Sequence, residues 1–309
     1  MEKSDKIFIA GHRGLVGSAL VRKLDQGGFT NLLTRDRASL DLRNSEAVDR
    51  FFAAEKPAVA VIAAAKVGGI KANNDLPVEF LLDNLQVQNN VIQAAYENGV
   101  RKLLFLGSSC IYPRHAPQPI PESALLSGPL EPTNEAYAIA KIAGIKLCQA
   151  YDREYGANFI SAMPTNLYGP NDNFDLLSSH VLPALIRKAH TAKQERQREL
   201  GVWGSGNPRR EFLHVDDLAA ACVFLLEKYN SPEIINVRCG EDISIRELAE
   251  LICDIVGFQG ELAWDTTKPD GPPRKLLDVS KIHALGWRHQ IGLREGIERT
   301  YEWFLENEK

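Results

Sequence analysis

The sequence predicts an α/β protein whose centre is a doubly wound parallel sheet, followed by a second, smaller domain. Three observations support this prediction. Short apolar runs alternate with longer helical patterns, these runs lack an alternation of apolar and polar residues, and closely spaced glycines follow the first run. Strands that lack this alternation are buried on both faces, which is typical of a parallel sheet covered by helices.

The first half of the chain holds five predicted strands and the helices between them. The strands are expected at 6–11, 31–35, 58–65, 102–108 and 158–164. Helices are expected between them, at 15–28, near 44–54 and 78–98, and at 134–156. Pro132 and Thr133 signal the start of the last helix and Gly156 its end.

The second half is less regular. Residues 169–210 are polar and rich in turn residues, whereas 210–229 and 233–238 indicate one more helix and strand of the sheet. A helix at 244–257, a Pro/Gly-rich loop at 267–275 and a terminal helix follow. We therefore assign 1–168 and about 211–238 to a Rossmann domain that binds NADP, and about 169–210 and 239–309 to a substrate domain.

Composition excludes several classes of partner. The chain has 309 residues and a net charge of -4, which gives no electrostatic footprint for nucleic acid. No apolar run is long enough to span a bilayer and no signal peptide is evident, so we expect a cytoplasmic protein without a membrane partner. The five cysteines are odd in number and form no CxxC pair, which argues against disulfides and against a metal site.

Three glycines mark the turn between the first strand and the first helix, at Gly11, Gly14 and Gly17. Such a turn lets a pyrophosphate approach the backbone N–H groups at a helix N-terminus, although glycines also serve as plain turn residues. Arginines in this loop and after the second strand favour the 2′-phosphate of NADP(H): Arg13, Arg35 and Arg37. Asp36 could instead face an unmodified ribose, and surface arginines are often only solvated.

Tyr137 and Lys141 lie four residues apart on a predicted helix, so their side chains share one face. The ammonium group can then favour the ionised phenol and bind a ribose. Ser108 and Cys110 follow a predicted strand, and ligands of such sheets bind at the C-terminal ends of strands. The two segments are therefore expected to converge. In isolation, an amphipathic helix with a snorkelling lysine explains the pair equally well.

Motifs along nearly the whole chain resemble the extended short-chain dehydrogenase/reductase family that acts on nucleotide sugars, and within it the GDP-L-fucose synthase family. The motifs are GxxGxxG at 11–17, "AAAKVGGI", "GSSCIYP", YxxxK at 137–141, "NLYGPNDNF", "SSHVLPALIRK", "VWGSG", "REFLHVDD" and "KPDGPPRKLLDVS". The resemblance implies an NADPH-dependent enzyme that epimerises GDP-4-keto-6-deoxy-D-mannose at C3 and C5 and then reduces C4. The local sequence around Arg37 departs from the family pattern, so which arginine holds the 2′-phosphate stays open.

The resemblance also implies roles for individual residues. Ser108, Tyr137 and Lys141 would form the reductase triad, and Cys110 and His180 the acid/base pair of the epimerase. Substrate contacts would come from Lys188, Trp203, Arg210 and Asp270. The implied cofactor contacts are Gly11, His12, Arg13, Gly14, Leu15, Val16, Gly17, Arg37, Asp41, Leu42, Ala64, Leu106, Gly107, Ser108, Tyr137, Lys141, Pro164, Thr165, Asn166, Leu167 and His180.

The chemistry suits these residue types. Protons on C3 and C5 are α to the C4 carbonyl, so their removal leaves an enolate whose oxygen needs hydrogen-bond donors such as Tyr137 and Ser108. A thiolate is an adequate base near neutral pH if cations surround it, and imidazole is an adequate acid. From the residues alone, Cys110 is equally a small packing residue, and His180 is no better a candidate than the other six histidines.

The residues that would hold the GDP-sugar are less specific. Five basic residues lie on loop-rich segments, and two of them could neutralise a diphosphate: Lys188, Arg209, Arg210, Lys268 and Arg274. Trp203 could stack on a base or fill the domain interface.

Two other functions compete with this reading. One is an NAD-dependent nucleotide-sugar 4-epimerase or 4,6-dehydratase on the same scaffold; relatives of the dehydratase type would be expected to carry an acidic residue near Cys110. The other is a noncatalytic dinucleotide-binding regulator, against which the intact serine, tyrosine and lysine argue. The resemblance also implies a homodimer through the helices near 80–98 and 134–155, whose apolar faces could equally belong to the core.

Overall fold

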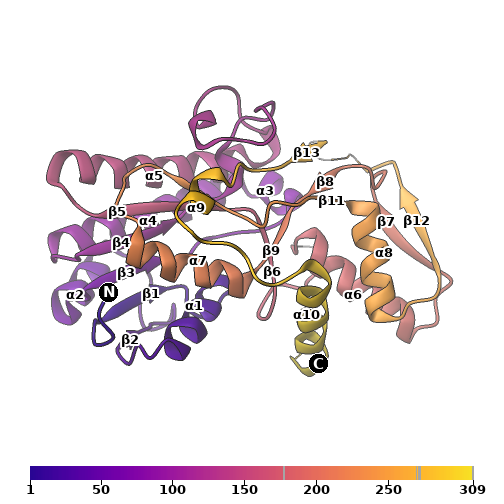
Figure 1. Ribbon diagram of the computed structural model, residues 1–309, viewed down its shortest axis with the longest axis horizontal. Helices are drawn as coiled ribbons and strands as arrows, with labels where there is room; N and C mark the ends of the chain where they lie inside the picture. The colour runs from indigo at the N-terminus through magenta and orange to yellow at the C-terminus, as the bar shows by residue number, and fades with distance from the viewer. Residues whose placement is uncertain (177, 269, 271–272, 308–309) are drawn as a thin grey trace.

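The computed structural model describes residues 1–176, 178–268, 270 and 273–307, and a six-stranded parallel sheet lies at its centre (Figure 1). The strand order is β10-β5-β4-β3-β1-β2, and it reverses at β1 because β2 and β3 flank that strand. The predicted doubly wound sheet is therefore confirmed. Its strands are β1 (Ile7–Ala10), β2 (Leu32–Leu33), β3 (Val59–Ile62), β4 (Lys102–Leu106), β5 (Phe159–Pro164) and β10 (Ile235–Val237).

Helices cover both faces of this sheet because consecutive strand residues point to opposite sides. Phe8 and Ala10 of β1 belong to one core, and Ile7 and Ile9 to the other. Helices α2 (Ser45–Glu55), α4 (Pro77–Glu97) and α5 (Glu135–Tyr155) complete the first core. Helices α1 (Leu15–Gln26), α7 (Val215–Lys228) and α9 (Ser280–Ala284) complete the second.

A third core lies beside the sheet, on the right in Figure 1. It is built from α6 (Val181–Gln194), α8 (Ile245–Val256), α10 (Leu293–Asn307) and the strand pair β7 (Glu199–Trp203) and β12 (Glu261–Asp265). The interpretation of 169–210 as irregular chain was wrong for α6 and β7. Residues 280–287, assigned above to the substrate domain, return to the sheet, where Ile282 and Trp287 lie in the second core.

Short elements join the sheet to the third core. Strands β11 (Ile243–Ser244), β8 (Arg209–Arg210) and β13 (Arg274–Lys275) form a small sheet in that order, and β6 (Asn166–Tyr168) pairs with β9 (Phe212–His214). The remaining elements are α3 (Ile70–Asp75) and the 3₁₀ turns η1 (Ser109–Ile111), η2 (Glu122–Ala124) and η3 (Pro132–Asn134). In the predicted loop 267–275, positions 269, 271 and 272 lie outside the described residues. Within the described ranges, no helix is long and apolar enough to cross a membrane.

Candidate active site

The end of β4 carries a hydroxyl and a thiol. The chain leaves the strand at Gly107 and turns into η1, where the Ser108 side chain accepts a hydrogen bond from the backbone N–H of Cys110, with N and Oγ 3.4 Å apart. Ser108 is half-buried, and Cys110 is only 7% exposed. Both groups therefore lie at the C-terminal edge of the sheet, where doubly wound folds bind their ligands.

Helix α5 brings Tyr137 and Lys141 to the same edge. The ammonium group of Lys141 donates a hydrogen bond to the carbonyl oxygen of Leu106, the last residue of β4, over 2.7 Å. Its Nζ lies 5.8 Å from the centre of the Tyr137 ring, and Phe80 of α4 packs edge-on against that ring. The strand end and the helix are thus joined directly by the lysine.

Electrostatics at this edge keep the phenol protonated. Burial raises the pKa of Tyr137, the Cys110 thiol raises that pKa further, and the Ser108 hydroxyl opposes the change. The expectation that Lys141 would favour an ionised phenol does not hold, because burial dominates. Burial also lowers the pKa of Lys141 to about 8. A protonated phenol is suited to donate a proton.

The Cys110 thiol is subject to opposing influences. Burial raises its pKa, whereas Lys275, the Ser108 hydroxyl and Lys141 lower it, in decreasing order of effect. Lys275 lies on β13 and was missed by the sequence reasoning. Its position follows from the pairing of β13 with β8, segments far apart in the chain, so no local signal could have revealed it.

His180 is the residue that precedes α6, and a glycine holds its segment in place. The N–H of Gly69 donates to the carbonyl oxygen of Ser178 over 3.0 Å, and the Asn73 side chain donates to the carbonyl oxygen of Gly69. His180 as a residue is exposed, and desolvation by the surrounding protein lowers the pKa of its imidazole. Among the described residues, its side chain makes no hydrogen bond to the other four proposed catalytic residues.

The turn after β1 fits the pyrophosphate of a dinucleotide. Gly11 has φ of 86°, which favours glycine, and a Cβ on Gly17 would lie 2.1 Å from the carbonyl oxygen of Gly11. Gly14 provides no side-chain cap for α1, and the first turn of α1 has no acidic residue. The N–H groups at this helix N-terminus can therefore bind an anion. Ala64 also approaches Gly11 closely.

Two of the three candidate arginines have largely exposed side chains. Arg13 pairs with Asp36 over 2.8 Å, and Arg37 lies 3.8 Å from Asp41, with their side chains 73% and 70% exposed. Arg35 instead pairs with Glu55 of α2. Arg13 and Arg37 therefore remain the candidates for a 2′-phosphate, and Asp36 is already engaged by a guanidinium group.

Two lysines flank Trp203, a residue that is 58% exposed. The ammonium groups of Lys188 and Lys268 lie 5.6 and 5.7 Å from the centre of that ring. Asp270 accepts hydrogen bonds from the N–H and the hydroxyl of Ser205, which fixes the turn after Trp203. An exposed, cation-flanked indole is a suitable surface for stacking.

Two of the five basic candidates are engaged elsewhere. Arg209 pairs with Asp242 over 2.8 Å and with Glu247, and Arg274 pairs with the same Asp242. Residues in register on neighbouring parallel strands share a face, so Arg210 and Lys275 point away from these partners of Arg209 and Arg274. Burial lowers the pKa of Lys275, and so does the charge of Arg210, whereas Cys110 and Glu131 raise it.

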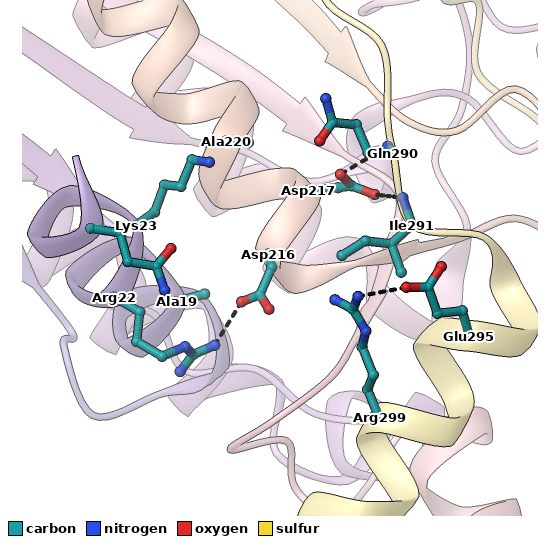
Figure 2. Close-up of a pocket in the computed structure, with 11 residues that line it drawn as sticks. Ala19, Arg22, Lys23, Asp216, Asp217, Ala220, Gln290, Ile291, Glu295 and Arg299 are labelled. Carbon is teal, nitrogen blue, oxygen red and sulfur yellow. Dashed lines mark hydrogen bonds and ion pairs between the residues drawn. The ribbon is translucent and has the colours of Figure 1, made fainter.

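A polar hollow of about 460 Å³ lies apart from these residues, between α1, α7 and α10 (Figure 2). Arg22 pairs there with Asp216 over 2.8 Å, and Arg299 donates to Glu295. Asp217 accepts hydrogen bonds from the N–H groups of Gln290 and Ile291. These charges satisfy one another, so the hollow provides no excess charge for a ligand.

Comparisons with known proteins show the family to which the chain belongs. A family model described as the NAD dependent epimerase/dehydratase family matches residues 7–237. The chain is 64% identical over 307 residues to "Putative GDP-L-fucose synthase 2" of Arabidopsis thaliana, covering 99% of this chain and 94% of the relative. It is 54% identical to "GDP-L-fucose synthase" of Escherichia coli, covering 98% and 97%. A crystal structure of a GDP-L-fucose synthetase from Naegleria fowleri bound to NADP has a TM-score of 0.92 at 32% identity, covering 99% and 96%.

Proposed function

Because this chain belongs to the NAD dependent epimerase/dehydratase family, we infer that it converts GDP-4-keto-6-deoxy-D-mannose to GDP-L-fucose with NADPH. The observation that carries this conclusion is the position of Cys110 beside Ser108, Tyr137 and Lys141 at the end of β4. A thiol at this place supplies the base that epimerisation requires. The alternative of a 4,6-dehydratase calls for an acidic residue near this position, and the named relatives are called neither 4-epimerases nor 4,6-dehydratases.

Epimerisation is the first half of the proposed reaction. The Cys110 thiolate and the His180 imidazole serve opposite faces of the sugar ring, one removing and the other returning a proton at C3 and at C5. The enolate that forms carries its charge on the C4 oxygen, where Ser108 and Tyr137 donate hydrogen bonds. Protonated Tyr137 suits this role because it can donate without first gaining a proton.

Reduction is the second half. NADPH, when bound, supplies the hydride that reduces the C4 carbonyl. The chain would hold it with the glycine turn at 11–17, with Arg13 and Arg37 near the 2′-phosphate and with Lys141 at the nicotinamide ribose. Tyr137 donates its proton to the C4 oxygen, and Ser108 orients that oxygen.

The GDP portion is proposed to bind across the third core. Trp203 offers its face to the base, while Lys188 and Arg210 meet the diphosphate. Asp270 acts through the Ser205 turn, which sets the position of Trp203.

Exposed apolar side chains on α4 and α5 support a homodimer. Val78 is 70% exposed, Leu82 49% and Ile139 44%. The two helices pack side by side, and a second copy of this surface would bury those side chains. Val78→Glu with Leu82→Glu should give a monomer by light scattering, and an unchanged mass would contradict this interface. All five cysteines are free thiols, which suits a reducing compartment such as the cytoplasm.

The test of the proposed function follows epimerisation and reduction separately. Purified protein is mixed with GDP-4-keto-6-deoxy-D-mannose in D₂O, and proton NMR follows the signals of the protons on C3 and C5 before and after NADPH is added. We expect loss of both signals without NADPH, and consumption of NADPH with formation of GDP-L-fucose afterwards. NADPH consumption without exchange at either carbon would indicate a simple 4-reductase and refute the proposal.

A further inference from the structure

We propose that Asn84 is a positioning residue for His180, and that it acts through residues 66–69, the segment that follows β3. The inference rests on the proposed function because it takes His180 to act on the sugar, but the contacts themselves do not require any substrate. Asn84 neither gains nor loses a proton in the reaction. It fixes the backbone to which the segment before His180 is hydrogen-bonded.

Asn84 lies on α4 and is only 3% exposed. Its side-chain oxygen accepts a hydrogen bond from the N–H of Lys66 over 2.9 Å, and its side-chain nitrogen donates to the carbonyl oxygen of Lys66 over 3.0 Å. The same nitrogen donates to the carbonyl oxygen of Phe80 over 2.7 Å. One amide thus binds both backbone groups of Lys66, as a residue of a neighbouring antiparallel strand would. It replaces the ladder after β3 has ended.

A second buried asparagine holds the other end of this segment. Asn73 of α3 is 7% exposed, and its side-chain nitrogen donates to the carbonyl oxygens of Gly68 and Gly69 over 2.7 and 3.0 Å. A Cβ on Gly68 would lie 3.1 Å from the ring of Phe80, so the segment also packs closely against α4. Hydrogen bonds from two buried amides therefore select one path for residues 66–69.

This path leads to the proposed epimerase residue. The N–H of Gly69 donates to the carbonyl oxygen of Ser178 over 3.0 Å, and Ser178 precedes His180 by two residues. The other hydrogen bonds of Ser178 among the described residues are to residues 173–175 of its own loop. They do not fix this loop relative to the sheet. The bond from Gly69 joins backbone to backbone, so a displacement of residues 66–69 is passed on to the chain before His180.

The first test measures this link without substrate or NADPH. Amide hydrogen exchange is compared between the wild type and variants at Asn84. Asn84→Leu removes all three side-chain hydrogen bonds, and Asn84→Asp keeps an acceptor for the N–H of Lys66 but no donor for the two carbonyl oxygens. Protection of the Gly69 amide should fall about tenfold in both, whereas that of Val61 in β3 should not change.

Two more variants complete this measurement. Asn73→Ala should lower the protection of the Gly69 amide as well, because it releases the same segment from its other end. Asn98→Asp is the matched control, since Asn98 follows the last residue of α4 and its side chain donates to the carbonyl oxygen of Ala94. This control should keep the wild-type protection. If Asn84→Leu does not fold, Asn84→Asp and Asn73→Ala carry the test.

A second measurement separates positioning from general damage. Exchange of the C3 and C5 protons with D₂O, followed by proton NMR without NADPH, should lose about tenfold in turnover number in the Asn84 variants. The affinity for GDP, measured by calorimetry, should stay unchanged, because the proposed GDP contacts lie on the third core. Asn98→Asp should match the wild type in both measurements.

Three results would overturn the proposal. They are wild-type protection of the Gly69 amide in both Asn84 variants, a deprotected Gly69 amide with wild-type proton exchange, and a joint loss of proton exchange and GDP affinity. A wild-type protein that exchanges neither C3 nor C5 proton would instead refute the proposed function. The amide measurement would then still decide whether Asn84 holds the segment before His180.

Discussion

Replacement of Gly69 by alanine tests how His180 is held in the site. A Cβ at position 69 would lie 2.9 Å from the carbonyl oxygen of Ser179, the residue before His180. Ordinary van der Waals contact begins at 3.4 Å, so the segment must move by about 0.5 Å. The contact is with backbone, and rotation of a side chain cannot relieve it. Gly69 has φ of -65°, which alanine adopts without strain, so the effect is steric.

This displacement should lower the rate of proton exchange, because proton transfer depends on the distance between the donor and the acceptor. A misplacement of 1 Å can reduce catalysis about 10²-fold, so a shift of half that size should reduce proton exchange about tenfold. Exchange at C3 and C5 is followed by proton NMR in D₂O without NADPH. NADPH affinity, measured by fluorescence, should change less than proton exchange, because His180 is only one of the implied cofactor contacts and the glycine turn at 11–17 supplies several others.

Gly292→Ala is the matched control for this experiment. A Cβ at Gly292 has no heavy atom within 4 Å, and its φ is not in the left-handed region. This variant should exchange both protons at the wild-type rate. If Gly69→Ala retains exchange within about twofold of the wild type, the Gly69 contact does not control the position of His180, or His180 does not act on the substrate.

Three further substitutions separate the remaining roles. Cys110→Ser should nearly abolish exchange at C3 and C5, because serine yields almost no alkoxide; normal exchange would return Cys110 to a packing role. Tyr137→Phe should lower the rate of NADPH oxidation about 10²- to 10⁴-fold while NADPH still binds. If more than about a tenth of the wild-type rate remains, Tyr137 is not the proton donor. Arg13→Ala with Arg37→Ala should weaken the binding of NADPH by about 1.5 to 3 kcal/mol per contact and leave the binding of NADH unchanged. Equal losses of affinity for both cofactors would exclude a role in binding the 2′-phosphate.

The sheet could be predicted because its signals are local. Each central strand is an apolar run without alternation, and Gly156, with φ of 69°, ends α5 as expected. Helix α6 was missed because its buried residues occupy one face only, and because the turn-rich residues before it dominate the local composition. Its buried side chains include Leu182, Leu185 and Ile186.

The basic residues show where local signals fail. The sequence presents Arg209 and Arg274 as candidates for the diphosphate, as good as Arg210. In the structure both are bound to Asp242, more than 30 residues away from either along the chain. Lys275 was not singled out, because β13 is only two residues long and its meaning comes from its register with β8. Side-chain partners set by long-range pairing leave no periodic trace in the sequence.

The two halves of the proposed reaction also differ in whether their residues come from one part of the chain or from several. Ser108, Tyr137 and Lys141 come from one strand end and one helix of a single core, and the hydrogen bond from Lys141 to Leu106 ties them together. Cys110 shares that strand end, whereas His180 lies at the start of α6, in a segment that Gly69 contacts. The proposed reductase residues therefore come from one core, whereas the proposed epimerase pair also depends on how the segment before α6 meets the sheet. Substitutions that disturb this junction, as at Gly69, should consequently impair proton exchange before they impair proton donation by Tyr137.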